Sequence, residues 1–282
     1  MNQLSTEKRA QIVACLIEGN SLRATARLTG ACFNSVLKFV PQIGAACAAF
    51  QDQTFRNLNC RRVQCDEIWS FCHCKAKNVP EAKAAPHGAG DVWTWTAIDA
   101  DTKLVPCWFV GPRDASAAFR FMEDLSSRMA HRIQLTTDGL NFYLPAVGEA
   151  FGTDVDYAML VKVYGADPER TDARYSPPQC TGIRKAVISG EPDGDQISTS
   201  FIERQNLTMR MGNRRFTRLT NAFSKKVENH AHAVALTMMH YNFCRVHKTL
   251  RVTPAMEAGL TDHVWSFSEV VALLDHTEAK AA

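Results

Sequence analysis

The amino-acid sequence predicts an α/β protein: a mixed β-sheet flanked by helices, preceded by a small helical region and followed by a long one. Through much of the central part of the chain, apolar residues alternate with a period of two, which is typical of strands. Strand and helix patterns then alternate, which favours a sheet with helices on its faces. Of the 282 residues, 46% are hydrophobic, so the chain can bury one large domain and a small one.

Residues 1–45 are predicted to be a helix-turn-helix DNA-binding region. Ser5 can cap a first helix, a second is expected over about Leu22–Leu28, and a third over about Cys32–Val40, before Pro41. The third helix would present three polar side chains to a DNA groove: Asn34, Ser35 and Lys38. An ordinary three-helix packing unit is the alternative, because helix-turn-helix patterns are short. Residues 46–59 are expected to be a linker or a short connecting helix.

Residues 60–250 are predicted to form the main domain. Three strands are expected in succession, as an antiparallel meander, over Val63–Phe71, Asp91–Asp99 and Leu104–Val110. The next elements are expected to be a helix capped by Asp114, a strand over Ile133–Thr137, a helix over about Asn141–Phe151 and a strand over Tyr157–Val163. This order of strands and helices is that of a ribonuclease H-like domain.

The last part of the main domain is predicted to be an irregular insertion followed by helices. Residues 165–199 are rich in Pro, Gly, Asp and Ser and read as a long insertion with a small hairpin over Ala186–Ile197. The chain is helical again from Ser200, and apolar residues from Val227 to Tyr241 repeat at steps of four and three, which makes one helix face. Residues 251–282 are expected to be a C-terminal tail.

The distribution of charge indicates a polyanionic partner. The formal net charge is only +3, but residues 60–195 carry 15 basic against 19 acidic residues, whereas residues 196–251 carry 10 against 2. An acidic centre followed by a strongly basic segment suggests that a polyanion is held near a cation site. A solvated basic helix face is the alternative.

The cysteines and the hydropathy pattern favour a cytoplasmic protein. The first residues are polar, and no uncharged apolar run reaches the roughly 18–20 residues that span a bilayer, so we expect no membrane association. The ten cysteines are then reduced. Four of them are close in sequence but lie in a predicted strand, which favours buried structural thiols over a zinc site; these are Cys60, Cys65, Cys72 and Cys74.

Three carboxylates are the candidate catalytic and metal-binding residues. Asp66 lies in the middle of the first strand, where an unpartnered carboxylate is costly. Asp138 follows a short apolar strand, at the edge where α/β sheets place their ligands. Glu203 is expected in the first turn of the helical region. If the three meet, their repulsion requires cations, and oxygen ligands suit Mg²⁺ or Mn²⁺. Glu67 is adjacent to Asp66 but should point to the opposite face, so that only one of them joins a given site.

Each carboxylate also has a structural interpretation. Asp138-Gly139 is an ordinary turn pair, Ser200 to Glu203 fits a capping box, and Asp66 could pair with an arginine. The cations after Glu203 favour the functional interpretation, because a capping glutamate does not require them and a DNA backbone does. The candidate DNA-binding residues of this segment are Arg204, Arg210, Arg214, Arg215, Arg218, Lys225 and Lys226, and Asn206 and Arg210 share a helix face with Glu203.

Five blocks of the sequence resemble bacterial insertion-sequence transposases of the insertion sequence one family, within the DDE superfamily. Three would be catalytic: Asp66-Glu67-Ile68-Trp69-Ser70, Thr137-Asp138-Gly139 and Ser198 to Asn206. The other two are the stretch from Arg214 to Lys226 and the stretch from Tyr241 to Leu250 with Thr253-Pro254. The resemblance covers about residues 60–260.

The resemblance implies a ribonuclease H-like catalytic domain with Asp66, Asp138 and Glu203 as the acidic triad. Two divalent cations would then assist in-line attack on phosphorus, first by water and later by a DNA 3′-hydroxyl. Arg245 and His247 are implied as secondary candidates for contacting phosphate, and a structural role for His247 stays open. The implied partner is double-stranded DNA, both the ends of the element and the target, bound by a homo-oligomer.

Two other functions remain open on the sequence. A nuclease of the same fold that hydrolyses DNA without strand transfer would use the same metal site. A domesticated, non-catalytic DNA-binding protein would use the helix-turn-helix alone, but it would tolerate loss of the carboxylates, and all three are present.

Overall fold

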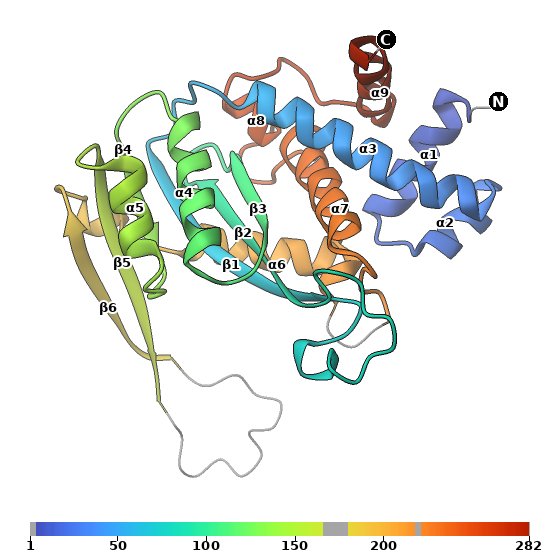
Figure 1. Cartoon of the computed structure of the whole chain (residues 1–282). Coiled ribbons are helices and arrows are strands. Elements are labelled where there is room, and N and C mark those ends of the chain that lie inside the picture. The colour runs from blue at the N-terminus through green and yellow to red at the C-terminus, as the bar shows by residue number, and fades with distance from the viewer. Residues whose placement is uncertain (1–3, 166–179, 218–220, 282) are drawn as a thin grey trace.

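The computed structural model describes residues 4–165, 180–217 and 221–281, and a six-stranded sheet lies at its centre (Figure 1). The sheet order is β3-β2-β1-β4-β5-β6. β1 pairs antiparallel with β2 and parallel with β4, and β5 pairs parallel with β4 and antiparallel with β6, so the sheet is mixed. The strands are β1 (Arg62–Cys72), β2 (Gly90–Asp99), β3 (Cys107–Gly111), β4 (Ile133–Thr137), β5 (Val155–Tyr164) and β6 (Cys180–Ser189).

Helices flank this sheet and extend to one side of it (Figure 1). α4 and α5 cover the face on which Trp95 of β2 packs against Phe121 and Tyr143, with ring centroids 6.0 and 5.5 Å apart. α6 contacts the other face, where the Gln64 side chain accepts hydrogen bonds from the start of that helix. The helices are α1 (Thr6–Ile17), α2 (Leu22–Thr29), α3 (Phe33–Thr54), α4 (Ala115–Arg128), α5 (Tyr143–Phe151), α6 (Ser200–Gly212), α7 (Val227–Met239), α8 (Pro254–Glu257) and α9 (Phe267–Ala281).

The element order predicted from the first strand of the main domain to the strand over Tyr157–Val163 is confirmed, including the helix cap at Asp114. Its side chain accepts a hydrogen bond from the Ala117 backbone at 2.9 Å, which satisfies one of the unpaired N–H groups at the start of α4. The third strand begins three residues later than expected. Val105 is held instead by the buried side chain of Asn242, through two hydrogen bonds of 3.0 Å to its backbone.

The third N-terminal helix is much longer than expected. We expected it to end at Val40, but α3 continues through Pro41 to Thr54, so most of the segment 46–59 belongs to this one helix and is neither a linker nor a separate connecting helix. Proline removes one helical hydrogen bond and costs about 3 kcal/mol inside a helix. The apolar face beyond it offsets that cost by packing against α7. The two helices approach so closely at Gly44 that a Cβ there would lie 2.5 Å from His232 Cβ.

The hairpin expected over Ala186–Ile197 is wrong. Residues Cys180–Ser189 form one strand, β6, which pairs with β5 instead of folding back on itself. The reason is that β5 presents an unpaired edge whose backbone groups need partners, and β6 supplies them. Residues 166–179 of the predicted insertion lie outside the described residues.

The stretch expected as a C-terminal tail contains α8 and α9 and belongs to the packed structure. α9 lies beside α1 and α3, and its residues Val270 and Val271 are at most 2% exposed. Their apolar side chains join the same core cluster as Ile12 of α1. The two ends of the chain therefore stabilise one another.

The cysteines form no disulfide, and Cys60, Cys65 and Cys72 are buried. Burial raises the pKa of the Cys72 thiol to about 11, so this thiol stays protonated at neutral pH. Among the described residues, no helix combines the length and the apolar character that a bilayer crossing requires.

Candidate active site

The pairing of β1 with β4 brings the first two candidate carboxylates together. The two strands run parallel, and the last register pair is Cys65 with Thr137. The next residue on each strand is an aspartate, Asp66 on β1 and Asp138 just beyond the end of β4. Neighbouring strands lie about 4.8 Å apart, so the register alone places these two residues side by side.

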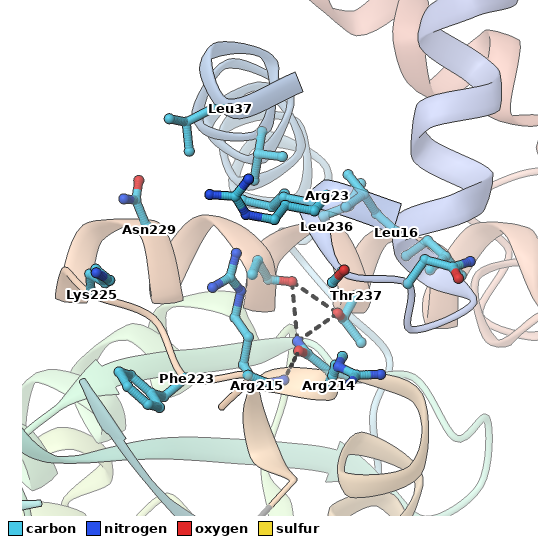
Figure 2. Close-up of a pocket in the computed structure, with 18 of the residues that line it drawn as sticks. Leu16, Arg23, Leu37, Arg214, Arg215, Phe223, Lys225, Asn229, Leu236 and Thr237 are labelled. Atoms are coloured by element: carbon cyan, nitrogen blue, oxygen red, sulfur yellow. Dashed lines mark hydrogen bonds between the residues drawn. The ribbon is translucent and has the colours of Figure 1, made fainter. Parts of the chain in front are cut away.

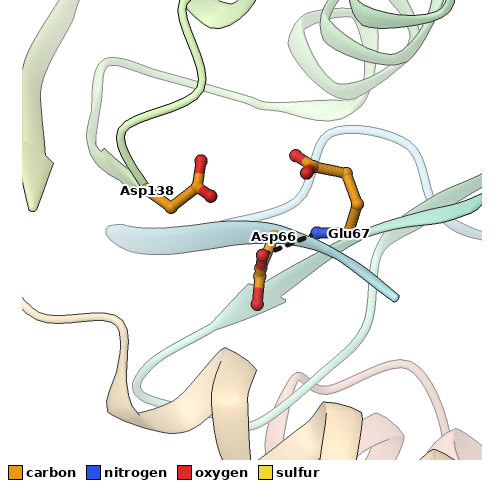
Figure 3. A group of neighbouring side chains, drawn as sticks. All are labelled: Asp66, Glu67 and Asp138. Atoms are coloured by element: carbon orange, nitrogen blue, oxygen red, sulfur yellow. Dashed lines mark hydrogen bonds between the residues drawn. The ribbon is translucent and has the colours of Figure 1, made fainter. Parts of the chain in front are cut away.

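A third carboxylate, Glu67, joins them. Asp66, Glu67 and Asp138 each offer an oxygen atom, and the three atoms lie within 4.8 Å of one another. Figure 3 shows Asp66 and Glu67 on opposite sides of β1, as strand alternation requires, with Asp138 beside them at the end of the neighbouring strand. The expectation that only one of the adjacent pair could join the site is wrong, because Asp138 lies beyond its strand, where it is not confined to one face.

Asp66 is held by two hydrogen bonds. Its Oδ1 accepts from the Glu67 backbone at 2.8 Å, and its Oδ2 accepts from Asn206 Nδ2 of α6, also at 2.8 Å. Burial, followed by the negative charge of Asp138, nevertheless raises the pKa of Asp66 to about 6. The two hydrogen bonds lower this pKa, so they position the carboxylate without removing the repulsion.

Glu67 is the most buried of the three, with a side chain only 1% exposed. Its Oε2 accepts a hydrogen bond from Arg113 Nε at 3.1 Å. Burial and then the charge of Asp138 raise the pKa of Glu67 to about 7. Within the described part of the chain, its Oε1 has no hydrogen-bond partner, while the buried Tyr143 lies near enough to the Glu67 carboxyl group to lower its pKa.

Asp138 is fixed by the turn that follows β4. Its Oδ1 accepts from the Leu140 backbone at 2.9 Å, the hydrogen bond expected of an aspartate that opens a turn. Burial raises the pKa of Asp138, while that backbone hydrogen bond and then Arg113 lower it. The turn interpretation of this residue is therefore confirmed, and the same residue also lies in the carboxylate cluster.

The three carboxylates fit a divalent cation. Burial is the largest cause that raises all three pKa values, so each carboxylate is costly to ionise without a nearby positive charge. Carboxylate oxygens are the ligands that Mg²⁺ and Mn²⁺ prefer. A cation with oxygens at about 2.1 Å places opposite ligands about 4.2 Å apart and adjacent ligands about 3 Å apart, so side-chain rotation would have to bring the three oxygens closer to complete such a site.

Glu203 lies near this cluster but not within it. It is in the first turn of α6, and its Oε1 accepts from Lys162 Nζ at 2.5 Å and from Thr199 Oγ1 at 2.6 Å. Its charge still raises the pKa of Asp66. The capping box expected with Ser200 is not formed, since Thr199 is the N-cap residue and makes no side-chain cap hydrogen bond to the backbone. The residue of α6 that contacts the cluster directly is Asn206.

The predicted DNA-binding residues are mostly at the surface. Asn34 and Lys38 on α3 are exposed, and Ser35 is partly buried. In the basic segment, Arg204, Arg214, Lys225 and Lys226 are exposed, Arg210 and Arg215 are partly buried, and Arg218 lies outside the described residues. Arg245 and His247 follow α7 and its π-helical continuation. The His247 ring contacts Thr249 Oγ1 at 3.0 Å, and burial lowers its pKa.

Sequence reasoning missed the participation of Glu67, Arg113 and Tyr143. The signal for Glu67 was its position next to Asp66 in a strand that otherwise buries apolar residues. Arg113 lies in the loop between β3 and α4, Tyr143 is the first residue of α5, and no local pattern connects them to β1. Only the sheet order, which puts β3 two strands from β1, and the packing of α5 on the sheet bring them to Glu67.

Comparison with known proteins adds little to this geometry. No protein-family model and no curated protein sequence matches the chain. Among solved structures, a piggyBac transposase in a synaptic complex with hairpin DNA is similar over 97% of this chain and 71% of that one, with 11% identity and a TM-score of 0.40. Similarity at this level transfers neither residues nor activity to this chain.

Proposed function

We propose that this chain is a ribonuclease H-like DNA transposase that cleaves and joins DNA strands of an insertion element. The observation that carries the proposal is the β1–β4 register, which sets Asp66 beside Asp138 in a buried carboxylate cluster with raised pKa values. Perturbed acidic groups of this kind cluster at functional sites. The mixed sheet order with a meander before the parallel strands is consistent with the proposed fold.

Asp66, Asp138 and Glu203 are proposed to hold two divalent cations, Mg²⁺ or Mn²⁺. Bound cations would activate the attacking oxygen and stabilise the leaving oxygen during in-line displacement at phosphorus. Asn206 orients Asp66 through its 2.8 Å hydrogen bond, and Arg113 orients Glu67 through its 3.1 Å hydrogen bond. Glu203 would join the site by leaving Lys162, and Glu67 is the competing third ligand because it already lies in the cluster.

The surrounding cations are proposed to hold the DNA backbone. α6 contacts the carboxylate cluster through Asn206. The same helix and the segment that follows it carry four exposed cations, which are Arg204, Arg214, Lys225 and Lys226. Residues 1–45 are proposed to recognise the element ends through Asn34, Ser35 and Lys38 on α3, and residues 60–250 to carry the chemistry. The target would be double-stranded DNA, bound by a homo-oligomer that holds two ends.

The test is a cleavage and joining assay with Mg²⁺ or Mn²⁺ on the DNA that flanks the gene. The variants are Asp66→Asn, Asp138→Asn, Glu203→Gln and Glu67→Gln, and DNA binding is measured in parallel. Wild-type joining that is lost in the aspartate variants, with DNA binding retained, supports the proposal. Loss in Glu203→Gln or in Glu67→Gln identifies the third ligand.

Other outcomes favour the alternatives. Cleavage without joining by the wild type would identify a nuclease. Equal behaviour of all five proteins would show that the carboxylates are not catalytic, and a DNA-binding role would then be the better account.

A further inference from the structure

Four aromatic side chains follow one another along the sheet from a position next to the carboxylate cluster. Trp69 of β1 lies directly opposite Trp93 of β2 in the sheet register. The Trp69 ring is 5.8 Å from that of Phe71, and the Phe71 ring is 5.0 Å from that of Phe223. All four rings are partly exposed. We call Trp93, Trp69, Phe71 and Phe223 the aromatic strip.

Cations lie over the aromatic strip at the end nearest the carboxylates. The Arg113 guanidinium is 4.7 Å from the centre of the Trp93 ring and also donates to Glu67. Lys75 Nζ is 5.9 Å from the centre of the Trp69 ring, and the lysine is exposed. The strip therefore starts at the candidate active site and combines aromatic faces with positive charge. That combination is typical of surfaces that bind single-stranded nucleic acids.

The other end of the aromatic strip opens onto a cavity of about 750 Å³ between α3 and α7, lined by Phe223. Four cations line this cavity, and none of its described lining residues is acidic: Arg23, Arg214, Arg215 and Lys225. Figure 2 shows Arg215 and Arg23 pointing toward the same space. The Arg215 guanidinium donates to Ser224 Oγ at 2.7 Å, a neutral partner, so an anion is the natural complement of the cavity.

We propose that the aromatic strip binds the bases of an unpaired DNA strand that leaves the carboxylate cluster, while the cations of the cavity hold its phosphates. The inference rests on the proposed function, which supplies the DNA. From Glu67 to Cys72 the extended strand β1 spans about 17 Å. At about 3.4 Å per stacked nucleotide, this length accommodates roughly five nucleotides. A duplex does not fit this role, because its base faces are already stacked on one another.

The test measures binding of single-stranded DNA in EDTA, where no metal-dependent cleavage occurs. The full-length protein is titrated into a fluorescein-labelled oligothymidylate of about 12 nucleotides, within the usual range of site sizes, and into a duplex of equal length. Fluorescence anisotropy reports both affinities. Trp69→Ala and Phe223→Ala should each weaken oligothymidylate binding at least about fivefold, the lower end of the range for one base stacked on a ring. Duplex binding should not change.

The controls separate stacking from folding. Trp69→Phe keeps an aromatic face and should retain most of the affinity, and Lys75→Gln, at an exposed position, should weaken binding without affecting the fold. Phe201→Ala is the matched control: Phe201 is 37% exposed and lies under Lys103 Nζ at 3.5 Å, but it packs at the start of α6 on the other face of the sheet. Thermal melts by circular dichroism identify any variant that does not fold. If an alanine variant is unfolded, the oligothymidylate affinities of Trp69→Phe and Lys75→Gln test the proposal in its place.

The proposal is overturned if the wild type does not bind oligothymidylate, if the strip variants bind it as the wild type does, or if Phe201→Ala weakens it equally. The Asp138→Asn variant should bind oligothymidylate normally. If the wild type does not cleave DNA but the strip variants lose oligothymidylate affinity, only the proposed chemistry is rejected. If the wild type cleaves DNA but the strip variants keep their affinity, only the role of the aromatic strip is rejected.

Discussion

Replacing Glu67 by glutamine should stabilise the metal-free protein at neutral and alkaline pH. Burial and the charge of Asp138 raise the pKa of Glu67 from its ordinary 4.5 to about 7. A carboxyl group with a raised pKa binds its proton more tightly in the folded state than in the unfolded state. The folded state therefore loses stability as the pH rises from about 4.5 to about 7, and the loss is complete above pH 7.

The expected size follows from the same shift. Each tenfold change in an acid dissociation constant corresponds to about 1.4 kcal/mol, so the ionised Glu67 costs about 3 kcal/mol. Because the Glu67 side chain is only 1% exposed, solvent screening does not reduce this figure much. Glutamine keeps the shape but gives up the charged partner of Arg113, so up to about 3 kcal/mol should be recovered at pH 8 and almost none at pH 4.

The assay is urea denaturation in EDTA at pH values from 4 to 8, followed by circular dichroism. The free energy of unfolding should decrease with pH for the wild type and change less for Glu67→Gln. Glu149→Gln, an exposed substitution on α5, is the matched control and should follow the wild type. Adding Mg²⁺ should stabilise the wild type above pH 7, since an ion that binds the folded state shifts the equilibrium toward it. Parallel curves for wild type and Glu67→Gln would refute the repulsion argument.

Three further predictions concern neighbouring features. Asn206→Ala should raise the pKa of Asp66 above its value of about 6, because a hydrogen bond to the ionised carboxylate is lost. An NMR titration of the carboxyl group measures this pKa, and an unchanged value would contradict the contact. Gly44→Ala should destabilise the fold by about 1–3 kcal/mol in urea denaturation, because the new Cβ would lie 2.5 Å from His232 Cβ. If the variant were as stable as the wild type, α3 and α7 would not be so close. Arg214→Gln should lower duplex DNA affinity at all sequences and reduce the salt slope by about one, and an unchanged slope would place this residue away from the phosphates.

Much of the main domain could be predicted from local pattern. Strand alternation located β1, β2, β4 and β5 to within about two residues, and the Asp114 cap placed the start of α4. The errors occurred where distant packing overrode a local signal. Pro41 is a strong helix breaker by itself, yet the burial of residues beyond it against α7 keeps α3 helical.

The candidate site was only partly predictable for the same reason. The sequence identified Asp66 and Asp138 as carboxylates in costly positions, one in an apolar strand and the other at the end of one. It did not reveal that Glu203 would be held by Lys162 of β5, because a salt bridge between residues 41 positions apart leaves no local pattern. It also did not link the four rings of the aromatic strip, since Phe223 lies far along the chain from Trp69.

The sequence by itself determined most strands and helices of the main domain and the candidate carboxylates, because these depend on periodicity, capping and the cost of burying charge, which are local properties of the chain. The tertiary structure decided which groups meet. The β1–β4 register set Asp66 beside Asp138, and the position of Asp138 beyond its strand admitted Glu67. The packing of α9 on α1 joined the two ends of the chain in one core. These contacts depend on long-range pairing, in which each element's position is fixed by surfaces that lie far from it in the sequence.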